Sequence, residues 1–399
     1  MRSDRSRKRL DTLLRVVRAA APIATMANRL DWKASIQMTL RSIVLLISLL
    51  ARSASGQEYA LSDRDLHGRI VIGSSYEQLD LATGKMSQWS IPLTISIPIA
   101  QRTTLGAHVS RARASSDSTG ELSGLSDVQF EIAKYVSLGS GSMIARLTGN
   151  LPSGKQHLTE DEFRTASTLS YNVYDFATAS LSQGAGIAPS ISLAMPITAK
   201  ASIGIAAGYY YRGGYDPLES LSSTYYPGRE LLVAGGFDLR LSNASIFSAD
   251  GRFSLYGRDR VDETEIFQAG NKIVGRVQYQ RWFGSSNLLI RGVYRSRAND
   301  NIASAEGVLF GENERIWPNE KAATVRFGTP VGSFANVTML ASVYQYGATV
   351  FLNSQTVVYR VGAVIEARVS RNLEVPVRLL VHQGDVSGYD VGIGITSTF

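Results

Sequence analysis

Apolar and polar side chains alternate along most of the chain with a period of two residues. The segment 357–369 shows this clearly, because apolar residues fill its odd positions while Arg360, Glu366 and Arg368 lie on even positions. Further segments of this kind are 89–99, 247–255 and 373–381. A period of two places alternate side chains on opposite faces of a β-strand. The pattern therefore predicts strands with one apolar face and one polar face.

Such segments number about sixteen after residue 68, with about 14 and 18 as bounds. Short turns are predicted at 100–102, 138–141, 198–200, 242–244, 283–286, 331–333 and 370–372. Long connections are predicted at 81–88, 113–124, 152–183, 214–228, 257–269, 297–320, 347–356 and 383–388. Short turns on one rim and long loops on the other are typical of transmembrane barrels. The predicted fold class is all-β, a transmembrane antiparallel up-and-down β-barrel.

A soluble β-sandwich is the alternative for alternating strands. A sandwich hides its apolar faces in a core and rarely needs so many strands in one unit. It also gives no reason for the regular change between short and long connections. Aromatic residues near strand ends fit the girdles of a membrane protein. These are Trp89, Tyr209, Tyr210, Tyr211, Trp282, Phe283, Tyr344, Tyr346 and Tyr359.

The N-terminus predicts export. Residues 38–56 contain Arg41, a short apolar run and small residues at Ala54-Ser55-Gly56, the pattern of a cleaved signal peptide. Residues 1–37 form a basic extension, which we interpret as an over-called start with Met38 as the initiator; a basic nucleic-acid-binding arm is the alternative. Residues 57–399 then form the barrel. A helical membrane span would need roughly 20 apolar residues, more than this run provides.

Charge and cysteine content narrow the class further. Residues 1–56 hold 11 Lys+Arg and 3 Asp+Glu, which leaves 30 basic and 31 acidic residues in the mature chain. The sequence pI of about 9.5 is therefore a property of the leader, and we expect no nucleic-acid partner. The chain has no cysteine, so disulfides and thiolate metal sites are excluded. We expect no metal and no cofactor.

The polar faces of the strands would line the barrel interior. The lumen or selectivity candidates are Arg276, Arg291, Arg326, Arg360, Glu366, Arg368 and Arg378. A basic wall would favour anions or carboxylate-bearing solutes. Interstrand ion pairing that only holds the wall together is the alternative for each of them.

The longest connection, 152–183, is the candidate for a constriction. Its acidic residues Glu160, Asp161 and Glu162 could face the basic wall across the lumen. General porins also fold the loop after their fifth strand inward, and this chain resembles them in architecture only. A solvated external loop remains open as an alternative, as does an extra hairpin within 164–180.

Two local patterns resemble known families. The final segment, with Ile393, Ile395 and Phe399 on one face, resembles the C-terminal strand of bacterial outer-membrane barrels. The resemblance implies a C-terminal assembly signal read by the barrel-assembly machinery. Gly124-Leu-Ser-Asp127, followed by Leu151-Pro-Ser-Gly154-Lys155, resembles transporters of the phenol meta-cleavage pathway type. That resemblance covers residues 120–156 and implies uptake of small hydrophobic or aromatic compounds.

The sequence thus predicts a passive pore or transporter in the outer membrane of a Gram-negative cell, surrounded by lipid and taking small aromatic or carboxylate solutes. A non-conducting structural or adhesive barrel is the alternative. A hydrolase would need a nucleophile and a base within hydrogen-bond reach. The chain has only four histidines and no Gly-x-Ser-x-Gly motif, so we expect no enzyme.

Overall fold

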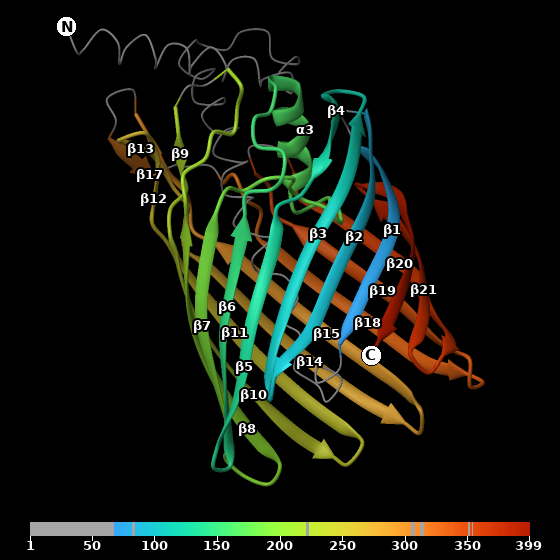
Figure 1. Cartoon of the computed structure of the whole chain (residues 1–399). Coiled ribbons are helices and arrows are strands. Elements are labelled where there is room, and N and C mark those ends of the chain that lie inside the picture. The colour runs from blue at the N-terminus through green and yellow to red at the C-terminus, as the bar shows by residue number, and fades with distance from the viewer. Residues whose placement is uncertain are drawn as a thin grey trace, which may run out of the picture.

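The computed structural model describes residues 68–81, 84–220, 223–304, 308–311, 315–349, 352 and 354–399. The basic extension, the signal peptide and the first residues predicted for the mature chain lie outside these residues. Most of the described chain is β-strand, in the arrangement of Figure 1.

Sixteen of the described strands form one antiparallel sheet that closes on itself. They are β1 (Arg69–Leu81), β2 (Gly84–Ala100), β3 (Thr103–Ser116), β5 (Val128–Leu138), β6 (Gly141–Leu151), β7 (Gly186–Pro196), β8 (Ala201–Arg212), β10 (Glu230–Ser242), β11 (Ser245–Tyr256), β14 (Lys272–Phe283), β15 (Ser286–Arg297), β18 (Glu320–Val331), β19 (Ala335–Tyr346), β20 (Thr356–Ser370), β21 (Leu373–Gly384) and β22 (Ser387–Thr398). Each strand pairs with its neighbours in chain order. The ring closes where β1 pairs with β22, from Arg69 opposite Thr398 to Asp80 opposite Ser387.

The two faces of the barrel differ as the sequence predicts. On the outside, Val361, Leu379 and Ile393 are each more than half exposed. On the inside, the neighbouring Arg360 and Asp390 are only 6% and 4% exposed. An apolar outer surface around a ring with every strand paired is what a bilayer requires, because hydrocarbon offers backbone groups no hydrogen bonds. The prediction of a transmembrane antiparallel β-barrel is confirmed.

All seven short turns are found where they were predicted, at the lower rim in Figure 1. Gly139, Gly284 and Gly332 have φ near +60° in three of them. Tight hairpins need such left-handed residues, and glycine adopts them without a side-chain clash. Within the described ranges, no helix is long and apolar enough to cross a membrane.

Several predicted long connections are wrong. Residues 84–88 belong to β2, and Leu81 pairs with Gly84, while 383–388 is a short turn between β21 and β22. In 113–124, β3 continues and pairs with the short strand β4 (Gly120–Leu125). The apolar alternation ends there while the backbone pairing goes on, because these strands extend beyond the apolar band into the polar loop region.

Three of the predicted girdle aromatics point inward. Trp89, Tyr209 and Tyr359 lie on the outer face, at 39–51% exposure. Tyr210 and Tyr346 are buried in the interior, and Tyr344 stacks on Tyr346 there. Composition at a strand end does not decide the face; the position in the two-residue period does.

A second, smaller sheet stands beyond the rim that carries the long loops, at the upper left in Figure 1. It consists of β9 (Tyr225–Tyr226), β12 (Arg258–Val261), β13 (Thr264–Gln268), β16 (Asn301–Ala303) and β17 (Leu309–Gly311). Asp259 connects two of its strands, accepting hydrogen bonds from the Tyr225 hydroxyl (2.7 Å) and the Gly228 amide (2.5 Å). Burial raises the pKa of Asp259 to about 6, while these hydrogen bonds oppose the shift. This carboxyl holds the external sheet together at the base of a long loop.

The outer surface generates the first prediction. Leu379→Arg, near the middle of β21, should lower the free energy of unfolding by about 2–4 kcal/mol, because it places a charge in hydrocarbon. Ser192→Arg is the matched control, since Ser192 lies on the inward face near the middle of β7 and would place the same charge in the lumen. Urea unfolding in lipid vesicles, followed by tryptophan fluorescence, measures both. Equal losses in the two variants would contradict the assignment of faces.

Candidate channel lumen and the loop that crosses it

The interior wall is chemically asymmetric. On β7, β8 and β10 the inward positions carry mostly small residues. They include Ala188, Ser190, Ser192, Ser202, Gly204, Ala206, Gly208, Ala234 and Gly236. From β14 round to β22 the inward positions carry most of the predicted basic residues. One side of the lumen is thus lined by small uncharged residues along the middle of its strands, and the other side is rich in arginine.

Three of the predicted arginines lie together on neighbouring strands. Arg291 of β15 donates from Nε and Nη2 to Gln278 Oε1 at 3.1 and 2.9 Å. Arg276 of β14 and Arg326 of β18 flank it, and Arg276 lies 4.0 Å from Asp250. We call Arg276, Arg291 and Arg326 the arginine cluster. These three arginines and Asp250 form a wall region where positive charge exceeds negative charge.

The remaining predicted wall residues are engaged in pairs. Arg378 lies 2.8 Å from Asp390 and 3.7 Å from Glu77. Glu366 accepts a hydrogen bond from Asn336, and Arg368 lies 3.7 Å from Glu374 near the short-turn rim. Side-chain exposures of 57% and 37% for Arg368 and Glu374 make this last pair a weak one. For these residues ion pairing accounts for much of the arrangement.

The connection between β6 and β7, residues 152–185, turns into the barrel; we call it the inner loop. It contains the helix α3 (Glu160–Ser170), where a helix had not been predicted. The Thr159 hydroxyl caps α3 by accepting a hydrogen bond from the Glu162 amide, and the Thr159 amide donates in return to the Glu162 carboxylate at 3.1 Å. The proposal of an extra hairpin at 164–180 is therefore wrong, and the barrel keeps sixteen strands.

After α3 the inner loop contacts one side of the wall closely. The Ala177 amide donates to Glu77 of β1 at 2.7 Å. Gln88 of β2 forms two hydrogen bonds of 2.8 Å with the backbone of Thr178. The Thr178 hydroxyl lies 2.9 Å from that of Ser110 on β3.

The same stretch also reaches the far side of the ring. Asp175 accepts a hydrogen bond of 2.5 Å from Arg360 Nη1 on β20. Asn172 donates to Glu320 of β18 at 3.4 Å, and the Tyr171 hydroxyl lies 3.0 Å from that of Thr349. Because β18 and β20 lie on the opposite side of the ring from β6 and β7, between which the loop runs, the inner loop crosses the lumen. An external solvated loop is thereby excluded for 171–183.

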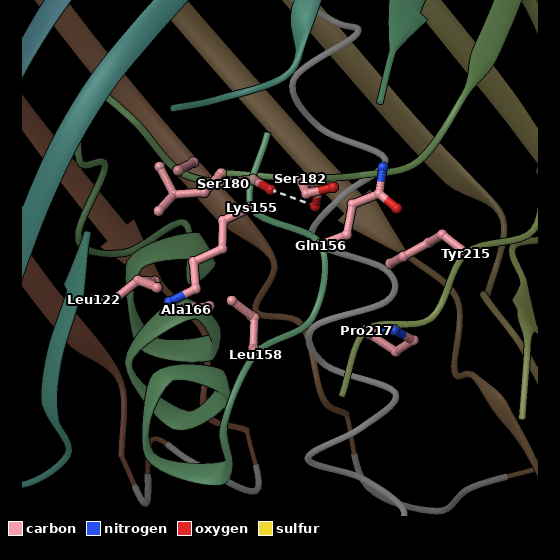
Figure 2. Close-up of a pocket in the computed structure, with 11 residues that line it drawn as sticks. Leu122, Lys155, Gln156, Leu158, Ala166, Ser180, Ser182, Tyr215 and Pro217 are labelled. Carbon is pink, nitrogen blue, oxygen red and sulfur yellow. Dashed lines mark hydrogen bonds between the residues drawn. The ribbon is translucent and has the colours of Figure 1, made fainter. Parts of the chain in front are cut away.

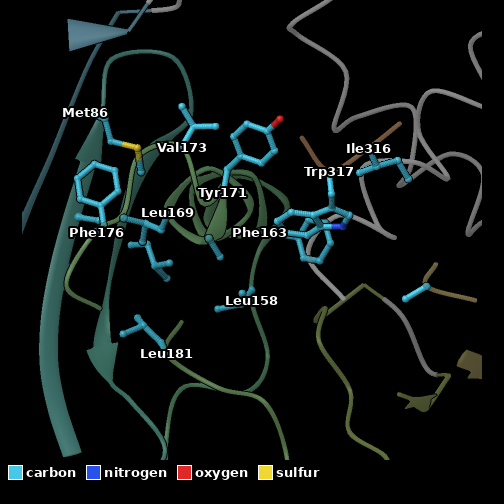
Figure 3. Close-up of a cluster of buried hydrophobic side chains, with 14 of the residues drawn as sticks. Met86, Leu158, Phe163, Leu169, Tyr171, Val173, Phe176, Leu181, Ile316 and Trp317 are labelled. Atoms are coloured by element: carbon cyan, nitrogen blue, oxygen red, sulfur yellow. The ribbon is translucent and has the colours of Figure 1, made fainter. Parts of the chain in front are cut away.

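Apolar side chains hold the inner loop in place. Phe163, Leu169 and Phe176 are each 5% exposed or less. Figure 3 shows them gathered around α3, with Met86 from β2 and with Trp317 from the segment before β18. Such a cluster forms only if the loop is docked, because these side chains have no other apolar partner layer.

The base of the inner loop is closed by one carboxylate. Asp127 is 3% exposed and accepts hydrogen bonds from the Gly154 amide (2.9 Å), the Gln183 amide (2.6 Å) and the Asn150 side chain (2.7 Å). Asp127 thus binds both ends of the loop. A Cβ on Gly154 would lie 1.9 Å from the Leu181 carbonyl oxygen, so only glycine fits there. The residues that carry the phenol meta-cleavage resemblance are the ones that form this base.

The three acidic residues predicted to face the basic wall across the lumen do not do so. Glu160, Asp161 and Glu162 form the first turn of α3, where acids favour the helix dipole. Asp161 pairs with Arg164, and Glu162 with Lys155. Within the described chain, Arg164 and Lys155 of the same loop supply these partners, and the loop acid that contacts a wall arginine is Asp175. The sequence analysis missed Asp175, and it also missed Glu77 and Gln88 as lumen residues.

A small cavity lies between α3 and the base of the loop. Its volume is about 20 Å³, and it is lined by residues such as Lys155, Leu158, Ser180 and Tyr215 (Figure 2). That space holds about one water molecule and no solute. In the described residues, no group of three or more His, Asp or Glu is arranged to hold a metal ion.

A closed ring of sixteen antiparallel strands, apolar outside and charged inside, defines a transmembrane β-barrel of the outer-membrane type. No protein family matches the chain, and no curated protein sequence matches it either. Among solved structures, the chain is similar to an outer membrane channel from Pseudomonas putida F1, at 10% identity and a TM-score of 0.40 over 86% of this chain and 98% of that one.

Two further solved structures are comparable. OpdL of Pseudomonas aeruginosa has 9% identity and a TM-score of 0.39 over 84% of this chain and 98% of that one. A mutant porin of Rh. blastica has 14% identity and a TM-score of 0.35 over 83% and 100%. The class of this barrel rests on its own strand pairing and its own outer surface.

The base of the inner loop generates the second prediction. Asp127→Ala leaves three donors without their acceptor, and one hydrogen bond to a charged group contributes about 1.5–3 kcal/mol. Amide hydrogen exchange in residues 152–185 should therefore become at least about tenfold faster, while the strands keep their protection. Asp117→Ala is the matched control, because Asp117 accepts only an exposed bond from the Lys85 amide among the described residues. Unchanged exchange in the Asp127 variant would show that the loop docks without this carboxylate.

Proposed function

We propose that this protein is a passive outer-membrane pore for small solutes, narrowed by the inner loop. A barrel of sixteen strands is wide enough for an aqueous passage unless something fills it. Charged inward residues need hydration or pairing, because an isolated buried ion is very unfavourable. The observation that carries the proposal is the combination of this polar wall with an inner loop that crosses the mouth.

Selectivity would come from the asymmetric wall. The arginine cluster lies below the inner loop on strands β14, β15 and β18 and has Asp250 as its acidic neighbour. A region of net positive charge in a narrow passage lowers the energy of anions and raises that of cations. The basic wall favours small anions such as carboxylates, and the family resemblance implies small hydrophobic or aromatic compounds.

Location and assembly follow from the same proposal. Lipid surrounds the apolar face, and the signal peptide at 38–56 would direct export. Ile393, Ile395 and Phe399 lie on the outer face, at 48–61% exposure, and Phe399 exchanges backbone hydrogen bonds with Gly68. We propose that the barrel-assembly machinery recognises these exposed apolar side chains. A non-conducting structural barrel and a hydrolase remain the alternatives. A folded barrel that never conducts would support the first, and turnover of lipid or peptide by the purified protein would support the second.

The third prediction tests the pore and its selectivity together. In a planar bilayer with a KCl gradient, the protein should conduct, with a reversal potential that favours chloride. Replacing Arg276, Arg291 and Arg326 together by Gln should shift the reversal potential toward the potassium value. Arg113→Gln is the control, since Arg113 is at an outward-facing position of β3 and pairs with Glu121. A correctly folded barrel that never conducts would overturn the pore, and an unshifted potential would overturn only the role of the arginine cluster.

The fourth prediction tests whether the inner loop controls the passage. The Ser110 and Thr178 hydroxyls are 2.9 Å apart and buried, and the chain has no native cysteine. The double variant Ser110→Cys, Thr178→Cys should form a disulfide that fixes the loop to β3. Oxidation should remove the higher conductance states, and dithiothreitol should restore them. The single variant Ser110→Cys controls for the substitution itself, and identical traces before and after reduction would contradict control by the loop.

A further inference from the structure

Two buried wall residues beside the inner loop have hydrogen-bond donors without an acceptor. Arg360 is 6% exposed, and its Nε and Nη2 have no partner among the described residues. His382 is 7% exposed and lies directly opposite Arg360, on the neighbouring strand β21. Neither ring nitrogen of His382 has a partner in the described part of the chain. Most buried polar groups in proteins are hydrogen-bonded, so this gathering of free nitrogens is unusual.

The free edge of Arg360 is the edge that recognises carboxylates. Nε and Nη2 carry two parallel N–H bonds, which match the two oxygens of a carboxylate. Tyr344 lies under the guanidinium, with its ring centre 4.6 Å from Cζ, and fixes the plane of the group. His382 can add a further donor to the same anion.

The nearby acids do not supply the missing acceptor. Glu77 and Asp390 both lie against Arg378 instead, at 3.7 and 2.8 Å. Asp175 of the inner loop contacts Arg360 through Nη1, on the other side of the guanidinium. The loop thus presents one carboxylate to a group that can hold another.

We propose that Arg360 and His382 form a carboxylate-binding site in the lumen, which Asp175 covers and partly occupies as an internal competitor. The proposal rests on the proposed function as a pore, and it names both the site and the class of its ligand. Because the free donors are buried beside the inner loop, a solute carboxylate reaches them only when the stretch around Asp175 moves away. Binding of the solute and departure of the loop are therefore coupled, and each favours the other.

The coupling has a simple consequence for affinity. A ligand that must displace part of the protein binds the native protein more weakly than it would bind the open form. Removing the competing side chain removes that loss of affinity. Asp175→Asn keeps the size of the side chain and removes its charge, so it should strengthen carboxylate binding. Arg360→Lys keeps the charge that pairs with Asp175 and removes the paired N–H donors Nε and Nη2, so it should abolish carboxylate binding while the loop stays docked.

The test uses sodium benzoate as the probe and benzamide as its neutral counterpart, with the full-length processed protein in detergent. Isothermal titration measures the dissociation constant for each. Benzoate should bind the native protein, and Asp175→Asn should lower its dissociation constant by about 5- to 150-fold, the usual range of coupling between two sites. Binding should be lost in Arg360→Lys, and benzamide should not bind. Asp161→Asn, an acid of the same loop that pairs with Arg164, is the matched control and should leave the constant unchanged.

The outcomes separate this site from the pore itself. An Asp175→Asn protein with unchanged benzoate affinity, or an Arg360→Lys protein that still binds benzoate, overturns the site. Hydrogen exchange that shows the loop still docked in Arg360→Lys excludes loss of binding through misfolding. Conductance in KCl without benzoate decides the pore independently. Benzoate binding in this pattern by a protein that never conducts would support the site and contradict the proposed function as a pore.

Discussion

The structure depends on one constraint: in hydrocarbon, every backbone amide and carbonyl must find its partner within the protein. A sheet meets this condition only if it has no free edge, and here β1 and β22 supply the last row of hydrogen bonds. Closure in turn fixes the faces of all sixteen strands. One parity meets lipid and the other meets the interior, so a single alternation in the sequence determines both the outer surface and the lumen.

The interior of the barrel has the opposite requirement, because its polar side chains need partners or water. Two features of the structure supply partners. Arginines and acids pair across neighbouring strands, and the inner loop brings hydrogen-bonding groups and a small apolar cluster into the mouth. Asp127 makes this possible by binding the loop at its entry and its exit. The strand itself is interrupted at this point, between β4 and β5, and the interruption frees the carboxylate for the loop.

The sequence predicts the barrel well because alternation is local and repeated. The strand 357–369 is recognisable from its own residues, and each short turn separates two such strands. It predicts the inner loop less well, because the loop's contacts join residues far apart in the chain, such as Asp175 with Arg360 and Gln88 with Thr178. The helix α3 did have a local signal, since Thr159 followed three residues later by Glu162 is a capping box. That signal also explains why the acids at 160–162 stabilise the first turn of α3 and do not face the wall. Glu77 and Gln88 lie on the inward parity of β1 and β2, but only the docked loop gives them their role.

The central claim is that alternate residues of each strand meet lipid and water. It is tested most directly by single cysteines placed one at a time from 357 to 369 in this cysteine-free chain, each carrying a nitroxide spin label in lipid vesicles. At odd positions such as Val361 and Ile365, oxygen dissolved in the bilayer should relax the label. At even positions such as Val364 and Glu366, a water-soluble nickel complex should do so instead. Accessibilities that do not alternate with a period of two along β20 would contradict the account.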